Sequence, residues 1–251
     1  LANRLANHLL IIRFSSFGDI IQATPVMGAF KRRFSEAKVS WLMREDFASL
    51  LTNHPHLDQL IRMPRRGGAL GLIKLAWKIS AEPITHVYDA HCNLRTHLFV
   101  LIFWMGRLWR RDWRWKFLRR PKNRWKRWLL FRWRINRFPM PFKGTESYLS
   151  PLATWGASEV SGGPDLVATA PLPESVSQEM AEMPRPWIAL APSAAWPMKR
   201  WPVDHWQSLA QKLDGSLMLL GGSDDHFISE IRGPRTVNLA GRLSLAESIS
   251  A

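Results

Sequence analysis

Short apolar runs alternate with helix-like patterns along the whole chain. The first run, residues 9–12, is followed by a small-residue loop over 15–19 and by a helical pattern from Ile20 onward. Four consecutive apolar residues before such a loop are typical of a strand buried on both faces of a parallel sheet. The pattern predicts further strands at 38–43, 57–62 and 85–89, with helices over 46–52 and from the glycines near 67 to 79. This alternation predicts an α/β fold, a parallel sheet wound with helices.

A second α/β pattern follows a stretch rich in Pro, Ser and Gly over 161–186. It predicts strands at 187–191, 216–220 and 237–241 and a helix at 203–213. Residues 245–251 form a helical pattern without a stop signal, so we expect a fragment whose second lobe is incomplete. A chain of 251 residues is long enough for two domains. We expect an N-terminal lobe over 1–160, a linker region over 161–186 and a partial C-terminal lobe over 187–251.

The net charge of +15 is concentrated in one segment. Residues 104–143 hold fifteen lysines and arginines, a single acid, Asp112, and seven of the fourteen tryptophans. The helical pattern that begins near residue 93 runs into this segment, and Pro121 divides it into two expected helices. On the first helix, an i, i+3, i+4, i+7 stripe is formed by Arg107, Arg110, Arg111 and Arg114. No charge-free apolar run here reaches the roughly 18 residues that a spanning helix needs.

Three interpretations of this basic, Trp-rich insertion remain open. Arginines with amphipathic tryptophans suit an anionic membrane surface. The same residues contact phosphates and stack on bases in nucleic-acid-binding proteins. A solvated basic face with partly buried tryptophans is the third interpretation.

Cysteine usage and the start of the chain bear on the compartment. Cys92 is the single cysteine, which excludes an internal disulfide framework and a multi-cysteine metal site. No signal peptide precedes the first strand, so the sequence favours the cytoplasm. We expect no metal and no cofactor.

Asp19 follows the first predicted strand, at the edge of the sheet where ligands bind in such folds. A carboxylate there is suited to general-base catalysis, but Asp is also a preferred helix N-cap for structural reasons alone. Gly18 is expected to permit a sharp turn, and Ser15 or Ser16 to supply hydroxyl or N–H groups to the same pocket. The local pattern alone leaves both roles of Asp19 open.

Five motifs, in order, resemble those of the ADP-heptose:lipopolysaccharide heptosyltransferases, glycosyltransferase family 9. They are RFSSFGDII at 13–21 with Thr24-Pro25, YDAHCNLR at 88–95, KRWP at 199–202 with Trp206, LLGG at 219–222 and NLAG at 238–241. Each motif alone is weak, but their order extends over most of the chain. The resemblance implies a GT-B architecture, two Rossmann-like lobes facing a cleft. The serine pair before Phe17 is more similar to heptosyltransferase I than to heptosyltransferase II.

The resemblance also implies roles for individual residues. Asp19 matches the catalytic base, and Lys199 matches the lysine that contacts the donor diphosphate. Ser193, in the same loop, is a further candidate that would donate a hydrogen bond to a phosphate. Acceptor-binding positions are implied at Ser15, Ser16, Gly18, His91, Asn93 and Arg95, although each also suits a cap or a surface position. Where the family often has more hydroxyls after Ser193, this chain has alanines, and the family's C-terminal Asp-Thr-Gly loop is absent.

The function implied by the resemblance is inverting transfer of heptose from ADP-heptose to the lipopolysaccharide inner core. The acceptor is expected to be an anionic lipid of the Kdo-lipid A type, and the enzyme to be cytoplasmic and peripheral on the inner membrane. We expect no nucleic-acid partner. The alternatives are a basic nucleic-acid-binding module on an α/β scaffold and an inactive, truncated family member.

Overall fold

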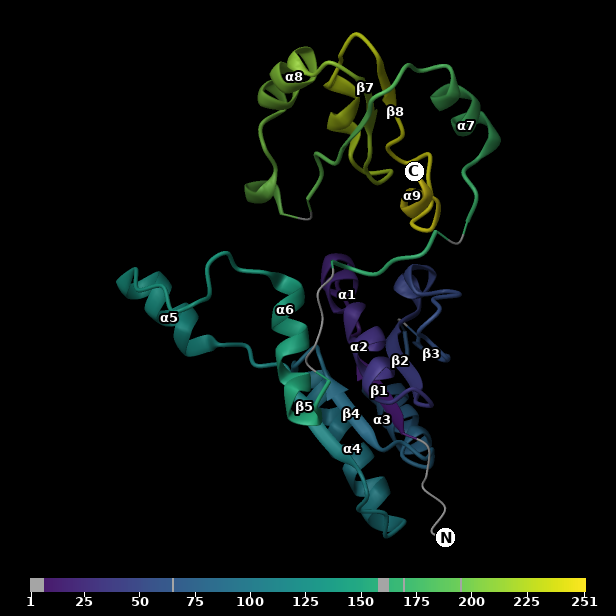
Figure 1. Cartoon of the computed structure of the whole chain (residues 1–251), viewed down its shortest axis with the longest axis vertical. Helices are drawn as coiled ribbons and strands as arrows, with labels where there is room; N and C mark the ends of the chain where they lie inside the picture. The colour runs from purple at the N-terminus through teal and green to yellow at the C-terminus, as the bar shows by residue number, and fades with distance from the viewer. Residues whose placement is uncertain (1–6, 65, 158–162, 169, 195) are drawn as a thin grey trace. The chain divides into compact units, whose positions relative to one another are not determined.

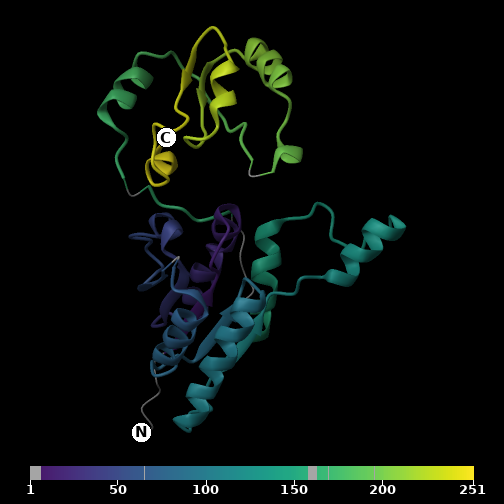
Figure 2. The same cartoon turned by 180° about the vertical axis from the view of Figure 1, so that it is seen from behind.

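The computed structural model describes residues 7–64, 66–157, 163–168, 170–194 and 196–251. The chain divides into two compact units, Leu1–Val167 and Ala168–Ala251. Figures 1 and 2 show both units from opposite sides. Each unit is an α/β structure with a parallel sheet, as the apolar pattern predicts.

The first unit contains a five-stranded parallel sheet with the order β3-β2-β1-β4-β5. The central strand β1 pairs with β2 on one side and with β4 on the other, and Ile12 lies opposite both Leu42 and Asp89. The carboxyl ends of β1 and β4 are therefore neighbours. The strands are β1 His8–Ile12, β2 Lys38–Arg44, β3 Gln59–Met63, β4 His86–Asp89 and β5 Lys116–Arg119.

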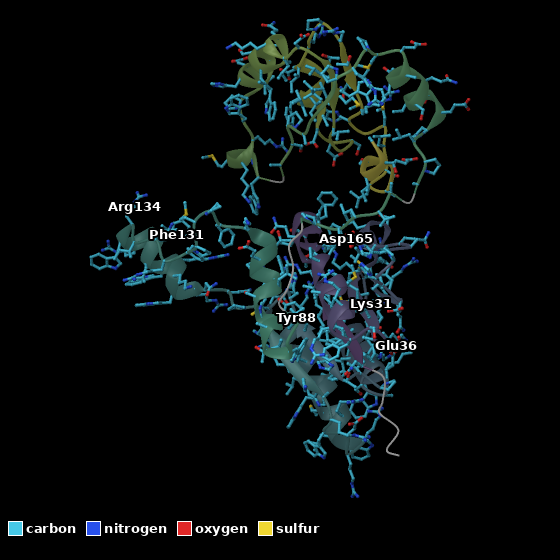
Figure 3. The ribbon with its side chains drawn as sticks, viewed as in Figure 1. Lys31, Glu36, Tyr88, Phe131, Arg134 and Asp165 are labelled. Atoms are coloured by element: carbon cyan, nitrogen blue, oxygen red, sulfur yellow. The ribbon has the colours of Figure 1, made fainter. Side chains whose placement is uncertain are left out.

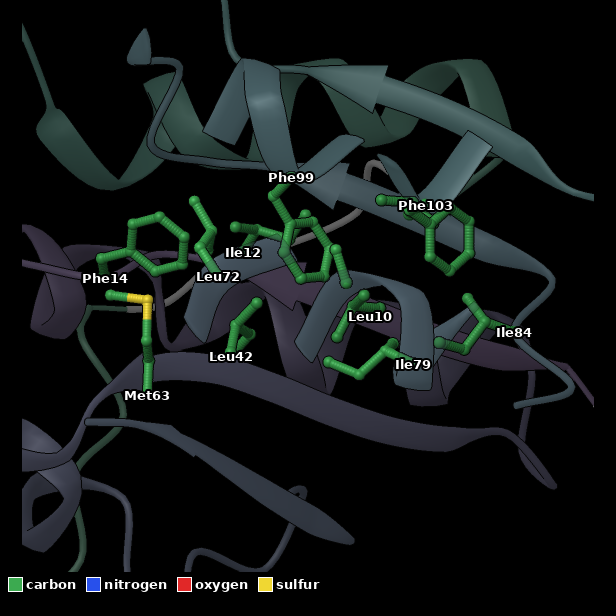
Figure 4. Close-up of a cluster of buried hydrophobic side chains, with 12 residues drawn as sticks. Leu10, Ile12, Phe14, Leu42, Met63, Leu72, Ile79, Ile84, Phe99 and Phe103 are labelled. Atoms are coloured by element: carbon green, nitrogen blue, oxygen red, sulfur yellow. The ribbon is translucent and has the colours of Figure 1, made fainter. Parts of the chain in front are cut away.

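Helices cover both faces of this sheet. Phe99 and Phe103 of one helix pack with strand residues such as Leu10 and Ile12 in the cluster of Figure 4. Because side chains alternate along a strand, the equally buried Leu9 and Ile11 face the opposite side. The helices of the unit are α1 Phe17–Ala23, α2 Pro25–Arg33, α3 Gly68–Ile79, α4 Leu94–Trp109, α5 Arg124–Trp133 and α6 Gly144–Leu149, with 3₁₀ turns η1 Glu45–Leu50 and η2 Ser150–Trp155.

The basic insertion departs from its predicted structure. In place of two helices divided by Pro121, it contains the end of α4, the edge strand β5 and then α5. Pairing of β5 with β4 outweighs the helical pattern of the sequence. Within the described ranges, no helix is both long enough and apolar enough to cross a bilayer.

The second unit contains a parallel sheet in the order β6-β7-β8. Residues 174–181, within the expected linker region, form α7, whose Val176 and Met180 are buried against Met218 of β7. A second cluster packs α8 against the other face through Ala210. The elements are α7 Glu174–Ala181, β6 Trp187–Leu190, η3 Pro197–Lys199, α8 Val203–Lys212, β7 Ser216–Leu219, η4 His226–Glu230, β8 Thr236–Asn238 and α9 Glu247–Ser250.

His86 of β4 is buried among aromatic rings. Its ring centroid lies 5.1 Å from that of Phe30 and 4.8 Å from that of Trp155. Its Nδ1 is 2.9 Å from the Thr85 hydroxyl, and its Nε2 is buried and has no hydrogen-bond partner among the described residues. Burial, followed by repulsion from Lys116, lowers the pKa of His86 to about 4.

The free energy of unfolding should therefore fall as the pH is lowered from 7 to 5. The unfolded chain, with an ordinary histidine pKa near 6.5, binds a proton that folded His86 excludes. The expected loss is about 1–2 kcal/mol for this imidazole. Urea unfolding at both pH values measures it, and His86→Phe should reduce the pH dependence. The exposed His97, changed to Gln, is the control; an unchanged slope in His86→Phe would contradict the assignment.

Candidate active site

Asp19 lies on the first turn of α1, just beyond the carboxyl end of β1. The N-cap of this helix is Ser16, so Asp19 is not the cap. The Ser16 hydroxyl donates to Asp19 Oδ2 at 2.9 Å, and the Tyr148 hydroxyl donates to Oδ1 at 2.9 Å. Arg13 forms an ion pair with Oδ2. The carboxylate is still 39% exposed, which leaves an oxygen lone pair accessible to a substrate hydroxyl.

The surroundings keep Asp19 ionised. Burial by itself would raise the pKa of Asp19, but the Arg13 guanidinium and the hydrogen bonds from Ser16 and Tyr148 outweigh it and hold this pKa below its usual range. Burial raises the pKa of Tyr148 to about 12, so its hydroxyl keeps its proton and remains a donor. Asp19 is thus a permanent proton acceptor in a fixed orientation.

Arg13 connects the carboxylate to the sheet. The residue follows β1 directly, is only 6% exposed, and donates from Nη1 to the Ala90 carbonyl at 2.9 Å. Ala90 follows β4 directly, so the pairing of β1 with β4 brings these two groups together. The guanidinium also lies 5.8 Å from the Tyr148 ring centroid. Figure 3 labels Tyr88, whose hydroxyl donates to the Tyr148 carbonyl at 2.8 Å and so fixes α6 against β4.

The loop residues predicted around Asp19 differ in what they contribute. Ser16 contacts Asp19 directly, and the Ser15 backbone forms a hydrogen bond with the His91 ring. The predicted turn at Gly18 is wrong, because Gly18 lies within α1 without a positive φ, and a Cβ there would meet nothing within 4 Å. Gly18 leaves the surface beside Asp19 open.

A cationic cavity of about 320 Å³ adjoins this site. Four of its lining side chains are basic, and none of its described lining residues is acidic. Such a lining attracts carboxylate or phosphate groups. The basic residues are Arg13, Arg120, Lys122 and Arg127.

Two of the predicted acceptor positions line this cavity, and a third does not. His91 and Asn93 are part of its wall, whereas Arg95 lines a separate cavity of about 280 Å³ beside Leu72. Burial and the nearby Arg13 lower the pKa of His91 to about 4, so its ring is neutral at pH 7. Asn93 also caps α4, since its side chain accepts from the Thr96 N–H at 2.9 Å.

Asp89 at the end of β4 organises the loop that carries His91. It is fully buried, accepts from the Cys92 N–H at 2.7 Å and forms an ion pair with Arg119 of β5 at 3.0 Å. The Thr96 hydroxyl donates to its second oxygen at 3.1 Å. All its contacts are within the fold, so Asp89 is a positioning residue.

The predicted arginine stripe does not form. Helix α4 ends at Trp109, and Arg111 has a φ of 53°, so Arg111 and Arg114 lie beyond the helix. Arg107 is 4% exposed, donates to the carbonyls of Glu82 and Ile84 at 2.8 Å each, and pairs with Asp112. Arg110 donates to the Ser80 hydroxyl at 2.9 Å. Arg107 and Arg110 therefore stabilise the α4 end, while Arg111 and Arg114 remain exposed.

The second unit places Lys199 and Ser193 on the same β6–α8 connection. Lys199 ends η3 and is exposed, and no ion pair found in the described part of the chain includes it. Its neighbour Arg200 is engaged, since it donates to the Ala194 carbonyl at 2.8 Å and pairs with Asp225 at 3.4 Å. Ser193 forms a hydrogen bond with Asp225. Lys199 is therefore the available cation of this loop.

Sequence reasoning did not identify three residues of this candidate site. Arg13 lies inside the loop motif at 13–21, and a charged residue directly after an apolar strand is the sequence signal that could have identified it. Arg120 and Tyr148 are separated from Asp19 by more than a hundred residues, so no local pattern connects them. Among the described residues, no group of three or more His, Cys, Asp and Glu is arranged to hold a metal ion.

Comparison with known proteins finds a similarity to one family. Residues 165–250 match the model of glycosyltransferase family 9 (heptosyltransferase). Lipopolysaccharide heptosyltransferase 1 of Campylobacter coli is 38% identical over 56 residues, 22% of this chain and 16% of that protein. The Pseudomonas aeruginosa protein of the same name is 23% identical over 231 residues, 82% of this chain and 57% of that protein.

Solved structures share the fold. The family 9 glycosyl transferase of Veillonella parvula has a TM-score of 0.70 at 17% identity, covering 96% of this chain and 72% of that chain. E. coli ADP-heptose lipopolysaccharide heptosyltransferase II has a TM-score of 0.65 at 20% identity, covering 96% of this chain and 75% of that chain. E. coli heptosyltransferase WaaC with ADP-2-deoxy-2-fluoro heptose has a TM-score of 0.61 at 14% identity, covering 96% of this chain and 78% of that chain.

The chain thus spans about a sixth of the length of the Campylobacter coli relative and somewhat more than half of the length of the Pseudomonas aeruginosa relative. Its parallel sheets are those of the GT-B-type heptosyltransferases. The match of residues 165–250 to the family model, the heptosyltransferase relatives and the shared fold together support an assignment to glycosyltransferase family 9.

Proposed function

We propose that the protein is an inverting glycosyltransferase that moves heptose from ADP-heptose to an anionic lipopolysaccharide-core acceptor. The observation that carries the proposal is an ionised, half-exposed carboxylate, Asp19, beside a cavity whose described charged residues are all cations. A nucleic-acid-binding module has no use for such an oriented carboxylate, and the family assignment does not favour that alternative. The names of the relatives supply the sugar and the donor class.

The reaction needs one proton acceptor. The acceptor hydroxyl oxygen attacks the anomeric carbon of heptose, the bond from that carbon to the diphosphate oxygen breaks, and ADP leaves with the electron pair. The hydroxyl proton passes to the Asp19 carboxylate. Tyr148 and Ser16 orient the carboxylate, and Arg13 keeps it ionised before each turnover.

The second unit is proposed to hold the donor. The growing negative charge on the departing diphosphate requires cations or N–H donors. Lys199 is exposed and has none of the ion pairs that hold Arg200 in place. Ser193 is a further candidate on the same connection.

The acceptor is proposed to bind in the cationic cavity. Arg120 and Lys122 present charge to it, and neutral His91 and Asn93 present polar groups suited to sugar hydroxyls. Arg95 is left out of this proposal because it lines another cavity.

A peripheral membrane position is part of the proposal. The stripe at 107–114 is not its basis, because two of its members are bound within the fold. The segment 122–143 is better suited: it has no acidic residue, and α5 has no buried residue. Its exposed tryptophans are Trp125, Trp128 and Trp133.

Asp19→Asn should lower turnover by about two to four orders of magnitude and leave donor affinity unchanged, because the amide cannot take the hydroxyl proton. Transfer kinetics and calorimetric titration with ADP measure the two effects. Asp46→Asn is the matched control, since Asp46 is 34% exposed and paired with Arg44. Turnover within a few-fold of the unaltered enzyme, in a variant that melts normally, would remove Asp19 as the base.

Lys199→Ala should weaken use of the donor far more than use of the acceptor, since the ammonium stabilises both the bound diphosphate and the leaving charge. Initial rates with each substrate varied separate the two effects. Lys212→Ala, on the exposed side of α8, is the control. An unchanged donor Michaelis constant together with unchanged turnover would contradict the role.

Changing Arg124, Arg132 and Arg137 together to Gln should lower binding to anionic vesicles by about two orders of magnitude, at roughly 1 kcal/mol per charge. Vesicle co-sedimentation measures it, with neutral vesicles expected to show little difference. The control removes three exposed cations elsewhere, Arg62, Lys74 and Lys78. Equal loss in both triple variants would mean that only net charge matters, and equal sedimentation of the Arg124 variant and the unaltered protein would refute the membrane surface.

A further inference from the structure

An apolar cavity lies directly beside the cationic cavity of the first unit. It has a volume of about 300 Å³, near the lower limit of ordinary ligand pockets. Three residues line both cavities, Arg127, Phe138 and Phe142. The two cavities therefore share a wall.

The chemistry changes across that wall. On one side lie the cations and polar groups of the cationic cavity. On the other side, Arg127 and Asn136 are the polar members of the lining, and the rest is apolar. The apolar members are Leu130, Phe131, Phe138, Met140 and Phe142.

The apolar lining is not a core of the protein. Phe131 is 79% exposed and Met140 is 78% exposed, although both are large apolar side chains. Helix α5, which carries Phe131, has no buried residue and stands away from the sheet in both views (Figures 1 and 2). In Figure 3, Phe131 and Arg134 lie on this arm, well apart from Tyr88 in the body of the unit.

Several aromatic rings give the cavity a defined shape. The Phe138 and Phe142 rings are perpendicular, with centroids 5.8 Å apart, and they form the shared wall. The Phe131 ring, on the helix itself, is a further aromatic member of the lining. The 129–130 carbonyls accept from the Arg134 N–H, which ends α5 and begins the loop over 135–142.

We propose that the two cavities together form one subsite for an anionic lipid, with the charged headgroup in the cationic cavity and a single acyl chain in the apolar one. Arg127 lies at the junction and neutralises the headgroup where the chain begins. Charge complementarity and the shared wall commit the site to a molecule with both chemistries. The inference rests on the proposed function in one respect, that the headgroup belongs to the sugar acceptor.

Such a subsite has a consequence for substrate choice. The protein would recognise the lipid part of the acceptor in addition to its sugar and its charge. Acceptors without a chain would bind through the cationic cavity alone.

Alkyl phosphates of four to ten carbons, kept below their micelle concentrations, test the proposal by calorimetric titration. Affinity should rise by about three- to fourfold for each added methylene until the cavity is filled. In the double variant Phe131→Asn with Met140→Asn this rise should be largely lost, while butyl phosphate binds as before. Both side chains are exposed, so the variant is expected to fold.

Leu101→Asn with Met105→Asn is the matched control, because it removes two exposed apolar residues of α4 and should retain the chain-length dependence. Arg127→Gln should weaken all the alkyl phosphates by a similar factor and keep the slope. An equal slope in the Phe131 variant and the unaltered protein would overturn the proposal. Affinity that does not depend on chain length in the unaltered protein would overturn it as well.

The readout is binding without turnover, so it separates this proposal from the proposed function. If Asp19→Asn loses sugar transfer and its affinity for alkyl phosphates still rises normally with chain length, both the proposed function and the lipid subsite are supported. A normal chain-length dependence in a protein that transfers no sugar refutes the enzyme and keeps the lipid subsite. Sugar transfer that is equally efficient with acylated and chain-free acceptors, together with a flat alkyl series, refutes the subsite and keeps the enzyme.

Discussion

A buried guanidinium at the end of β1 is the constraint around which the first unit is arranged. An arginine that is 6% exposed costs several kcal/mol of desolvation unless its charge is paired and its N–H groups are bonded. Arg13 meets most of this demand from three directions, through Asp19 of α1, the Ala90 carbonyl after β4 and the Tyr148 ring of α6. Its Nε is buried and has no hydrogen-bond partner among the described residues. Its own backbone is held by the sheet, since its N–H donates to the Leu42 carbonyl at 3.1 Å. The position of the carboxylate is therefore a consequence of strand register.

In the proposed reaction, the same pairing limits what kind of base Asp19 would be. A carboxylate with a lowered pKa has a weak affinity for protons, whereas the most effective general bases have a pKa near the working pH. The acceptor hydroxyl, however, becomes strongly acidic once its oxygen bonds to the anomeric carbon. A weak base that is always ionised and held in one orientation is sufficient at that stage. The arrangement thus favours orientation over proton affinity, and in the proposed reaction the departure of the diphosphate would be the step that needs the most electrostatic assistance.

Much of the fold could be predicted from local pattern, because β1 contains four consecutive apolar residues that are fully buried, as in a sheet covered on both faces, and β2 and β4 bury their apolar residues in the same way. The edge strand β5 could not be predicted in this way, since Lys116–Arg119 has only two apolar residues, between two charged ones, inside a helix-forming stretch. Only its pairing with β4 makes it a strand. Asp19 could be singled out as a candidate from the sequence because it follows a strand directly. Its partner Tyr148 was missed because a contact across 129 residues has no local signature.

In the basic insertion, the net charge of the segment does not tell which of its charged side chains are exposed and which are bound within the fold. Arg107 and Arg132 have the same side chain in the same kind of sequence. Arg107 nevertheless lies where it donates to the carbonyls of Glu82 and Ile84, so its guanidinium is bound within the fold. Arg132 lies on a helix with no buried residue, and its charge is left to the solvent. A guanidinium bound within the fold adds little to attraction at a distance, because its counter-charge, Asp112, accompanies it. The effective positive surface is therefore that of α5 and the loop after it, and the Trp and Phe side chains that share this surface make it suited to a ligand that is apolar as well as anionic.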